Sequence, residues 1–282
     1  MIAVKTALTM VIFDMKTAAY TICYNEIKKV DQWLYYTKEF DYRVVLDTGS
    51  TDGTYEALKK VPGIILHQAR KEPFKFHEHR NFNLSMVPDD VDWCLSPDMD
   101  EYFSINVLIE MERTIRENPT VNNIATTRLD IYSDKVFVGP PYSIPTNKIH
   151  RRHQYEWRAM IYEHLIYIGP GNENEVYNDK IFLVHDQDIT KPRDILYPKM
   201  LKERYSEDPT DSWNSWFLLN HYYRERDQLN YIEVAVNFLK FHNSRVDDKY
   251  REVFGDLSNI VKHDKNLDGG ILKALDVELQ NL

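Results

Sequence analysis

The sequence predicts an α/β protein with a doubly wound, mostly parallel sheet, followed by a helical C-terminal region. Between residues 18 and 82, short apolar runs alternate with amphipathic segments, which is typical of parallel strands joined by helices. Residues 121–185 carry strand-like patterns with few helical signals, and the chain from residue 191 onward is helical in pattern. We therefore expect two regions, at residues 1–190 and 191–282.

Four strands and three helices are expected in the first part of the chain. Apolar and β-branched runs predict strands at residues 18–25, 42–47, 63–68 and 91–96. The segments between them predict helices at 27–40, 50–61 and 77–87. The buried face of the first helix is expected to carry Ile27, Val30, Trp33 or Leu34, and Thr37.

Later helices follow from the same periodicity. Residues 104–118 predict a helix capped by Ser104, with a buried face of Ile105, Leu108, Ile109 and Ile115. Residues 212–223 and 231–242 predict a helical hairpin. Its spacing resembles a tetratricopeptide repeat at Trp216, Leu219, Tyr223, Ala235 and Leu239, with Asn220 in place of the usual glycine. One hairpin is too short for a solenoid, so we interpret it as a packed cap rather than a partner-binding array.

Composition narrows the class of protein. A hydrophobic content of 43% and a charged content of 28% are those of a globular protein. The net charge of −9 argues against a whole-surface grip on nucleic acid. Two cysteines, Cys23 and Cys94, make no disulfide framework, which favours a reduced, cytoplasmic protein. Charges interrupt the apolar N-terminal stretch, so we expect an extra strand or an appendage there and no signal peptide or membrane span.

Three polar clusters each follow an expected parallel strand. Asn25 and Glu26 follow the first strand, DTGSTDGT at 47–54 follows the second, and DMDE at 98–101 follows the fourth. Because the carboxyl ends of parallel strands share one edge, we expect the clusters to form one site. Crowded carboxylates repel one another unless a cation lies among them, and their oxygens suit Mg or Mn. The alternative, a solvated turn, does not explain why three clusters share an edge.

Four motifs together resemble the family 2 glycosyltransferases, which have the GT-A fold. They are YTICYNE, VVLDTGSTDGT, HEHRN and WCLSPDMDE, and the resemblance covers most of residues 18–186. It implies a GT-A (Rossmann-like) sheet and inverting transfer of a sugar from a nucleotide sugar, preferably a UDP-sugar.

The resemblance also implies roles for individual residues on the donor side. Asn25, Glu26 and Asp47 would hold the nucleobase and ribose, with Asp52 beside the base. Arg80 and Asn81 would help to hold the nucleotide. Asp98 and Asp100 would form the D-x-D pair, with Asp98 toward the ribose and Asp100 toward an Mn or Mg ion that bridges the diphosphate. Glu101 is expected to support the loop.

On the acceptor side, residues 148–165 resemble a second family motif. Trp157 and Glu163 match it, whereas Ala159 replaces the usual glycine and Tyr162 the usual histidine. The resemblance implies that Glu163 is the general base, with Asp130 as the second candidate. A structural ion pair between Glu163 and Arg158 is the alternative. His185 resembles the histidine that completes the metal shell, and its imidazole favours Mn.

The acceptor and the partners stay open at this point. A saccharide such as lipopolysaccharide is expected, and a peptide or a hydroxymethylated base in DNA are alternatives. The basic residues 150–153 are either a solvated face or, as we favour, a clamp on the diphosphate or the acceptor. In the DNA alternative, residues 148–153 would meet its phosphates. A non-catalytic nucleotide-sugar-binding scaffold is the alternative of another class. We expect a cytoplasmic protein, free or at the inner membrane surface, of undefined oligomeric state.

Overall fold

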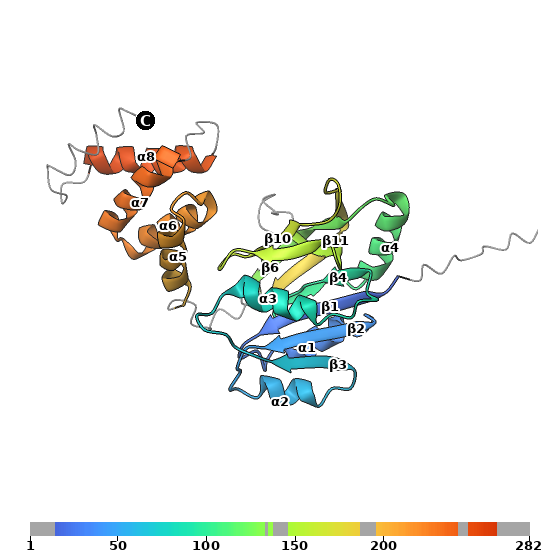
Figure 1. Cartoon of the computed structure of the whole chain (residues 1–282). Helices are drawn as coiled ribbons and strands as arrows, with labels where there is room; N and C mark the ends of the chain where they lie inside the picture. The colour runs from blue at the N-terminus through green and yellow to red at the C-terminus, as the bar shows by residue number, and fades with distance from the viewer. Residues whose placement is uncertain (1–14, 133–134, 138–145, 187–195, 242–247, 264–282) are drawn as a thin grey trace, which may run out of the picture. The chain divides into compact units, whose positions relative to one another are not determined.

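The structure is a computed structural model that describes residues 15–132, 135–137, 146–186, 196–241 and 248–263 (Figure 1). The chain divides into two compact units, Met1–Lys191 and Pro192–Leu282, and each is described by itself. Most of the N-terminal stretch for which an extra strand was expected, residues 1–14, lies outside the described residues. In the part of the chain that is described, no helix combines the length and apolar character needed to cross a bilayer.

Parallel strands form the first half of the sheet in the first unit. They lie in the order β3-β2-β1-β4 and comprise β1 (Thr17–Cys23), β2 (Tyr42–Asp47), β3 (Ile64–Gln68) and β4 (Trp93–Leu95). The connecting helices are α1 (Val30–Tyr36), α2 (Thr54–Lys59) and α3 (Phe76–Ser85). These elements confirm the sequence prediction. The strands are continuous apolar runs because side chains on both faces of a parallel sheet are buried.

The second half of the sheet is mixed, and it confirms the strand-rich middle section. It continues from β4 in the order β8-β6-β11-β5, with β7 paired to β6. Its strands are β5 (Glu101–Phe103), β6 (Asn123–Tyr132), β7 (Lys135–Phe137), β8 (Thr146–Arg151) and β11 (Glu175–Asp186). A separate hairpin pairs β9 (Tyr155–Arg158) with β10 (His164–Tyr167). Strand β8 runs antiparallel to β4, so its N-terminal end lies at the edge where β4 ends.

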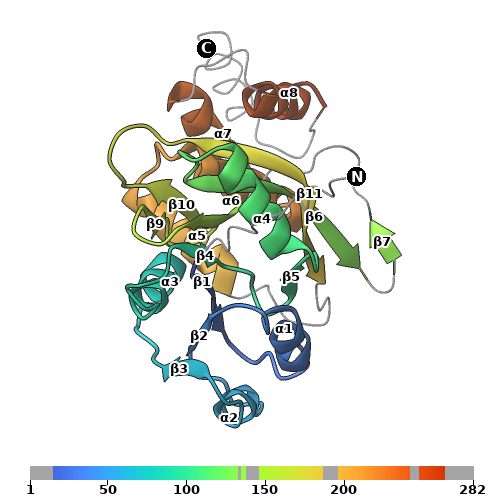
Figure 2. The same ribbon diagram turned by 90° about the vertical axis from the view of Figure 1, so that its right-hand side faces the viewer.

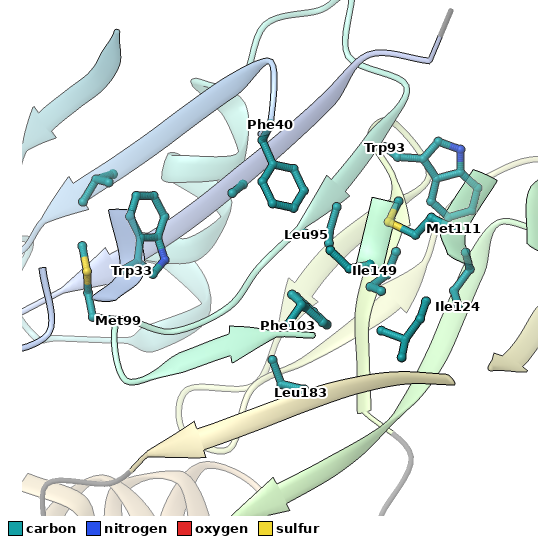
Figure 3. Close-up of a cluster of buried hydrophobic side chains, with 14 of the residues drawn as sticks. Trp33, Phe40, Trp93, Leu95, Met99, Phe103, Met111, Ile124, Ile149 and Leu183 are labelled. Atoms are coloured by element: carbon teal, nitrogen blue, oxygen red, sulfur yellow. The ribbon is translucent and has the colours of Figure 1, made fainter. Parts of the chain in front are cut away.

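Both faces of the sheet are covered, and Figure 2 shows α1 and α3 on opposite sides of β1 and β2. One face packs on α1, α2 and α4 (Val107–Glu117) through a cluster that includes Trp33, Leu58 and Met111 (Figure 3). The other face packs on α3 and the β9–β10 hairpin through Leu84 and Trp157. Fully burying a side chain such as Met111 contributes about 1.5–3 kcal/mol.

Two predicted helix faces differ from the observed ones. In α1, Val30, Trp33 and Thr37 are buried as expected, but Ile27 precedes the helix and is 40% exposed. Helix α4 begins at Val107, with Asn106 rather than Ser104 at the N-cap position. Its buried stripe is Val107, Met111, Thr114 and Ile115, whereas Ile105 and Ile109 are 83% and 69% exposed. Ile115 belongs to both the predicted and the observed stripe, and packing on the sheet selects the one that contains Val107 and Met111.

The second unit is helical, as predicted. It contains α5 (Leu196–Glu207), α6 (Ser212–Glu225), α7 (Gln228–Phe241) and α8 (Asp248–His263). Asp211 caps α6 by accepting a hydrogen bond from the Asn214 N–H at 3.0 Å. Among the residues that resemble a tetratricopeptide repeat, Leu219, Ala235 and Leu239 are buried, but Tyr223 is 67% exposed. The α6–α7 pair is therefore a packed hairpin that departs from the repeat pattern at Tyr223.

Candidate functional site

The loops that follow β1 and β2 are tied to each other by their own side chains. Asn25 Oδ1 accepts a hydrogen bond from the Thr51 N–H at 2.7 Å. The Glu26 N–H donates to Thr54 Oγ1 at 2.8 Å. Asn25 itself has φ 55, a left-handed conformation that asparagine tolerates better than most residues. The first two predicted polar clusters are thus adjacent in the structure.

Asp52 links the same two loops and binds the backbone of Thr54, the first residue of α2. One carboxylate oxygen accepts from the Ile27 N–H at 3.0 Å, and the other accepts from the Thr54 N–H at 3.0 Å. Burial works against the charged form, but the hydrogen bonds from Thr54 and Ile27 outweigh it and lower the pKa of Asp52. The next residue, Gly53, has φ 96, which requires glycine in this turn.

Asp47 is fully buried at the end of β2. Its Oδ1 accepts hydrogen bonds from the Gly49 and Ser50 N–H groups, each at 2.9 Å, and from Gln68 Nε2 at 3.0 Å. Three donors on one oxygen satisfy the buried carboxylate and fix it in position. Asp47 therefore shapes the DTGSTDGT turn from inside it.

Arg80, from α3, joins two candidate residues that lie far apart in the sequence. Its Nη2 donates to Asp98 Oδ1 at 2.7 Å, and its Nε donates to Glu163 Oε1 at 2.5 Å. The guanidinium also lies over the Trp157 ring, 4.7 Å from its centroid. Arg80 is only 5% exposed, so these charge-assisted bonds are shielded from water. Glu163 pairs with Arg80 and not with Arg158, whose partner is Glu156.

Lys148, from β8, holds the D-x-D loop from the other side. Its Nζ donates to Asp98 Oδ2 at 2.9 Å and also binds Glu101 Oε2. Glu101 is 2% exposed and accepts from the Asp98 N–H at 2.9 Å, so it supports the loop as expected. Burial opposes ionisation, but Arg80 and Lys148 hold the pKa of Asp98 well below its usual range. The two carboxylates in turn raise the pKa of Lys148 against the effect of burial.

His185 brings Asp100 and Asp130 together at the end of β11. Its Nε2 lies 3.4 Å from Asp100 Oδ2, and its Nδ1 lies 2.8 Å from Asp130 Oδ1. Arg128 contacts both Asp130 and His185 Nδ1. Nδ1 donates to Asp130 in one tautomer and accepts from Arg128 in the other. Either bond fixes the imidazole so that Nε2 faces Asp100.

The pair of Asp100 and His185 fits a divalent cation. Two ligands at bond lengths near 2.1 Å on one octahedral ion lie about 3 Å apart, close to the observed 3.4 Å. A histidine ligand whose other ring nitrogen donates to a carboxylate is the usual arrangement at metal centres. Around this point five carboxylates (Asp98, Asp100, Glu101, Asp130, Glu163) face three cations (Arg80, Arg128, Lys148), which leaves two negative charges. Within the described ranges, no group of three or more His, Cys, Asp or Glu side chains forms a metal site by itself.

Asn81 supports the neighbouring hairpin. Its Nδ2 donates to the Trp157 carbonyl and its Oδ1 accepts from the Trp157 N–H, both at 2.8 Å. The side-chain amide thus pairs with β9 as another strand would. Trp157 is held in this way beneath Arg80.

The basic residues 150–153 are not a clamp, which corrects the sequence interpretation. His150 is fully buried against the Tyr20 hydroxyl at 2.9 Å, and burial lowers its pKa to about 4. Arg152 donates to the Val87 carbonyl at 2.9 Å, and His153 contacts the Asp89 carbonyl. Since β8 is antiparallel to β4, its C-terminal end lies at the edge opposite the carboxylates. Only Lys148 of this basic segment binds Asp98.

Sequence reasoning missed the roles of Lys148 and Arg128 in the carboxylate cluster. Lys148 was visible only as part of a basic run, and Arg128 stands two residues before Asp130. Each residue reaches the carboxylates because its strand pairs with a strand that is distant in sequence, β8 with β4 and β6 with β11. The one usable signal was the excess of carboxylates in DMDE, which requires cations from elsewhere in the chain.

The fold is similar to that of solved structures of TarS from S. aureus. No family model and no curated protein matches this sequence. The structure of TarS residues 1–349 in complex with UDP-GlcNAc is 14% identical, with a TM-score of 0.51 over 95% of this chain and 89% of that one. This chain has a GT-A-like fold. A longer TarS structure is also 14% identical, with a TM-score of 0.50 over 94% of this chain and 54% of that one, so this chain spans about half its length.

Proposed function

We propose that the chain is a glycosyltransferase that moves a sugar from a UDP-linked donor to an acceptor hydroxyl with inversion of configuration. The observation that carries the proposal is the edge where β1, β2 and β4 end. There the Asp98–Asp100 loop, His185 and Glu163 meet in a GT-A-like fold. The similar TarS structure contains UDP-GlcNAc. In an open α/β sheet this edge is where ligands bind.

The donor would lie across the loops after β1, β2 and β4. Asn25, Glu26 and Asp52 would face the base and ribose, and Asp47 would act from behind them by holding the turn between β2 and α2 in place. Asp98, held by Arg80 and Lys148, would accept from the ribose. Arg80 and Asn81 would complete the nucleotide side, with Asn81 acting through Trp157. The proposed catalytic domain is residues 1–190, and the helical region at 191–282 would be a packed cap.

Asp100 and His185 would hold Mn or Mg, with Asp98 beside them. The ion would neutralise charge on the leaving diphosphate as the glycosidic bond breaks. The two uncompensated negative charges of the cluster support this site, as does the tautomer in which His185 Nδ1 donates to Asp130 and Nε2 has the lone pair that binds an ion. Asp130 would therefore orient His185, which leaves Glu163 as the better candidate for the base.

Glu163 would accept the proton of the attacking hydroxyl. Arg80 binds Oε1, so Oε2 is the oxygen that would take the proton. The carboxylate is 11% exposed, which limits competition from water. General-base catalysis by such a group contributes about 10²–10⁴-fold.

The first experiment is a donor-hydrolysis and transfer screen over UDP-sugars with Mn or Mg, read by mass spectrometry. We expect EDTA and Asp100→Asn each to abolish turnover, and Glu163→Gln to reduce transfer by about 10²–10⁴-fold while UDP binding persists. Asp90→Asn is the matched control, because Asp90 is a surface carboxylate bound to Lys16. Full activity of Asp100→Asn, also in EDTA, would contradict the metal site.

A saccharide is the acceptor that we propose first, and a peptide is second. The argument for DNA rested on the basic segment 148–153, and His150, Arg152 and His153 of that segment bind within the protein. A scaffold that binds a nucleotide sugar without turnover would give UDP binding and no product with any donor. A cytoplasmic location, free or at the inner membrane surface, belongs to the same proposal.

A further inference from the structure

Arg128 belongs to a group of charged residues that crosses three neighbouring strands. Asp130 on β6 is aligned with His185 on β11, and His185 is aligned in turn with Glu101 on β5. Arg128 stands two residues before Asp130, so its side chain projects from the same face of the sheet. Its Nη1 lies 3.8 Å from Glu101 Oε1. The guanidinium therefore reaches from β6 across β11 to the residue that follows the D-x-D pair.

One side of this guanidinium is fixed, and the other is open. Nε and Nη2 both lie 3.2 Å from Oδ1 of Asp130, and Nη2 also contacts His185 Nδ1. Among the described residues, Nη1 makes no hydrogen bond, because 3.8 Å to Glu101 is too long for one. Nη1 is accessible to solvent, and the side chain of Arg128 is 34% exposed. This nitrogen can therefore donate to a ligand without breaking the contacts that hold the guanidinium.

The other two cations of the carboxylate cluster are less available to a ligand. Arg80 is 5% exposed, and its Nη1, which binds neither of its two carboxylate partners, is buried. Lys148 is 14% exposed, and its Nζ is shared by Asp98 and Glu101. Of these three cations, Arg128 is therefore the one with an accessible donor atom.

The position of Arg128 indicates which part of a nucleotide donor it would meet. Arg128 contacts His185, whose Nε2 lies 3.4 Å from Asp100. Asp98, which we place toward the ribose, is held by Arg80 and Lys148 instead. Arg128 thus lies on the side of the D-x-D pair that faces away from the nucleoside. A guanidinium there suits phosphate oxygens, because its planar N–H groups match their geometry.

We propose that Arg128 Nη1 donates to the sugar-linked phosphate of the nucleotide donor and keeps this contact in the departing diphosphate. This inference rests on the proposed function. When the glycosidic C–O bond breaks, its electron pair stays on the phosphate oxygen, so the negative charge of the diphosphate increases. A cation that is already fixed beside that oxygen stabilises the added charge without reorganisation. Arg128 is therefore a donor-binding residue as well as a partner of Asp130.

Binding of uridine, UMP and UDP tests this assignment, because the three probes differ only in their phosphates. In titration calorimetry with Mn, Arg128→Gln should bind UDP about 10–100-fold more weakly than wild type, as expected for a hydrogen bond between charged groups. UMP and uridine should bind within about twofold of wild type, since neither carries the distal phosphate. An equal loss for all three probes would mean that Arg128 only supports the fold. An equal loss for UMP and UDP would exclude the distal phosphate, and either result would overturn the inference.

Lys29→Met is the matched control for the loss of one positive charge. Lys29 binds Asp186, which follows His185 at the end of β11, so Lys29 lies close to the same cluster. A charge that acts only from a distance is weakened by solvent and salt, so this variant should change UDP affinity by less than about threefold. A loss as large as that of Arg128→Gln would reduce the effect to general electrostatics and overturn the proposed contact.

The binding measurements also separate this inference from the proposed function, because none of them requires turnover. A selective loss of UDP binding in Arg128→Gln, in a protein that transfers no sugar from any donor, would support the phosphate contact and contradict the enzyme. Sugar transfer by Arg128→Gln with wild-type UDP affinity would overturn the inference while the enzyme stands. Unchanged uridine binding in the same variant shows that it folds.

Discussion

Replacing Lys148 with methionine should strongly destabilise the first unit of the protein. Lys148 is 14% exposed and binds two carboxylates, Asp98 and the almost fully buried Glu101. Removing one partner of a buried ion pair costs about 3–5 kcal/mol, because Glu101 stays buried with only Arg128 Nη1, 3.8 Å from its Oε1, to offset its charge. With a urea slope near 2 kcal/mol/M, the unfolding midpoint should fall by about 1.5–2.5 M.

Lys29→Met is the matched control for this substitution. The two lysines are similarly buried, with Lys29 15% and Lys148 14% exposed. Their partners differ, because Asp186, the partner of Lys29, is 33% exposed, whereas Glu101 is 2% exposed. Water can solvate Asp186 after the substitution, so the loss should be about 1 kcal/mol or less. Equal losses in the two variants would refute the argument that burial of Glu101 sets the cost.

The dependence on pH gives a second check on Lys148→Met. Because the pKa of Asp98 is lowered in the folded protein, its contribution to stability is fully present above the unfolded-state pKa of ~4. That contribution is lost only as the pH falls through the folded-state pKa. Because the pKa of Lys148 is raised in the folded protein, its contribution to stability is fully present below the unfolded-state pKa of ~10.4. That contribution is lost as the pH rises through the folded-state pKa. Between these limits the wild-type contribution is constant. In the variant, protonation relieves the uncompensated charge, so the difference from wild type should narrow from pH 7 to pH 4.5, and a constant difference would refute this account.

Two further predictions concern turns. Ala159→Gly should leave stability unchanged or raise it by up to about 1.5 kcal/mol in urea unfolding, because relief of the φ 74 conformation offsets the flexibility of glycine; a loss above 1 kcal/mol would contradict this. Asp52→Ala should cost about 0.5–2 kcal/mol and Asp52→Asn less, since Asp52 accepts from the Thr54 N–H at the start of α2. Because the pKa of Asp52 is lowered in the folded protein, its contribution to stability is fully present only above the unfolded-state pKa of ~4. The cost of Asp52→Ala should therefore shrink in acid, and a cost that grows in acid would contradict this prediction.

The parallel half of the fold could be predicted because its information is local. Each strand there is a short run buried on both faces, and each helix has its own apolar stripe. The wrong expectations were those that needed partners distant in sequence. Ile105 and Ile109 fit one helical stripe, but the sheet covers the stripe of Val107 and Met111 instead. Helix periodicity alone cannot choose between two overlapping stripes.

The candidate site shows the same division. Residues after parallel strands could be placed at one edge from the sequence, because strand direction fixes where Asp47 and Asp98 emerge. The direction of β8 could not be deduced from its pattern, and it decides that Lys148 reaches Asp98 while His150 is buried. Charge balance was the physical clue. Carboxylates as dense as those of DMDE require cations, and the structure supplies them from α3, β6 and β8.

Arg80 explains why the donor and acceptor sides of the proposed site should be tested by separate substitutions. One guanidinium binds Asp98 through Nη2 and Glu163 through Nε, while Trp157 lies under its plane. A change at Arg80 would release Glu163 and leave Asp98 bound to Lys148 alone, so it would weaken nucleotide binding and disturb the base at once. Glu163→Gln keeps an oxygen that can accept from Arg80 and removes only the charge. A loss of transfer with retained UDP binding in that variant therefore assigns the effect to the acceptor side.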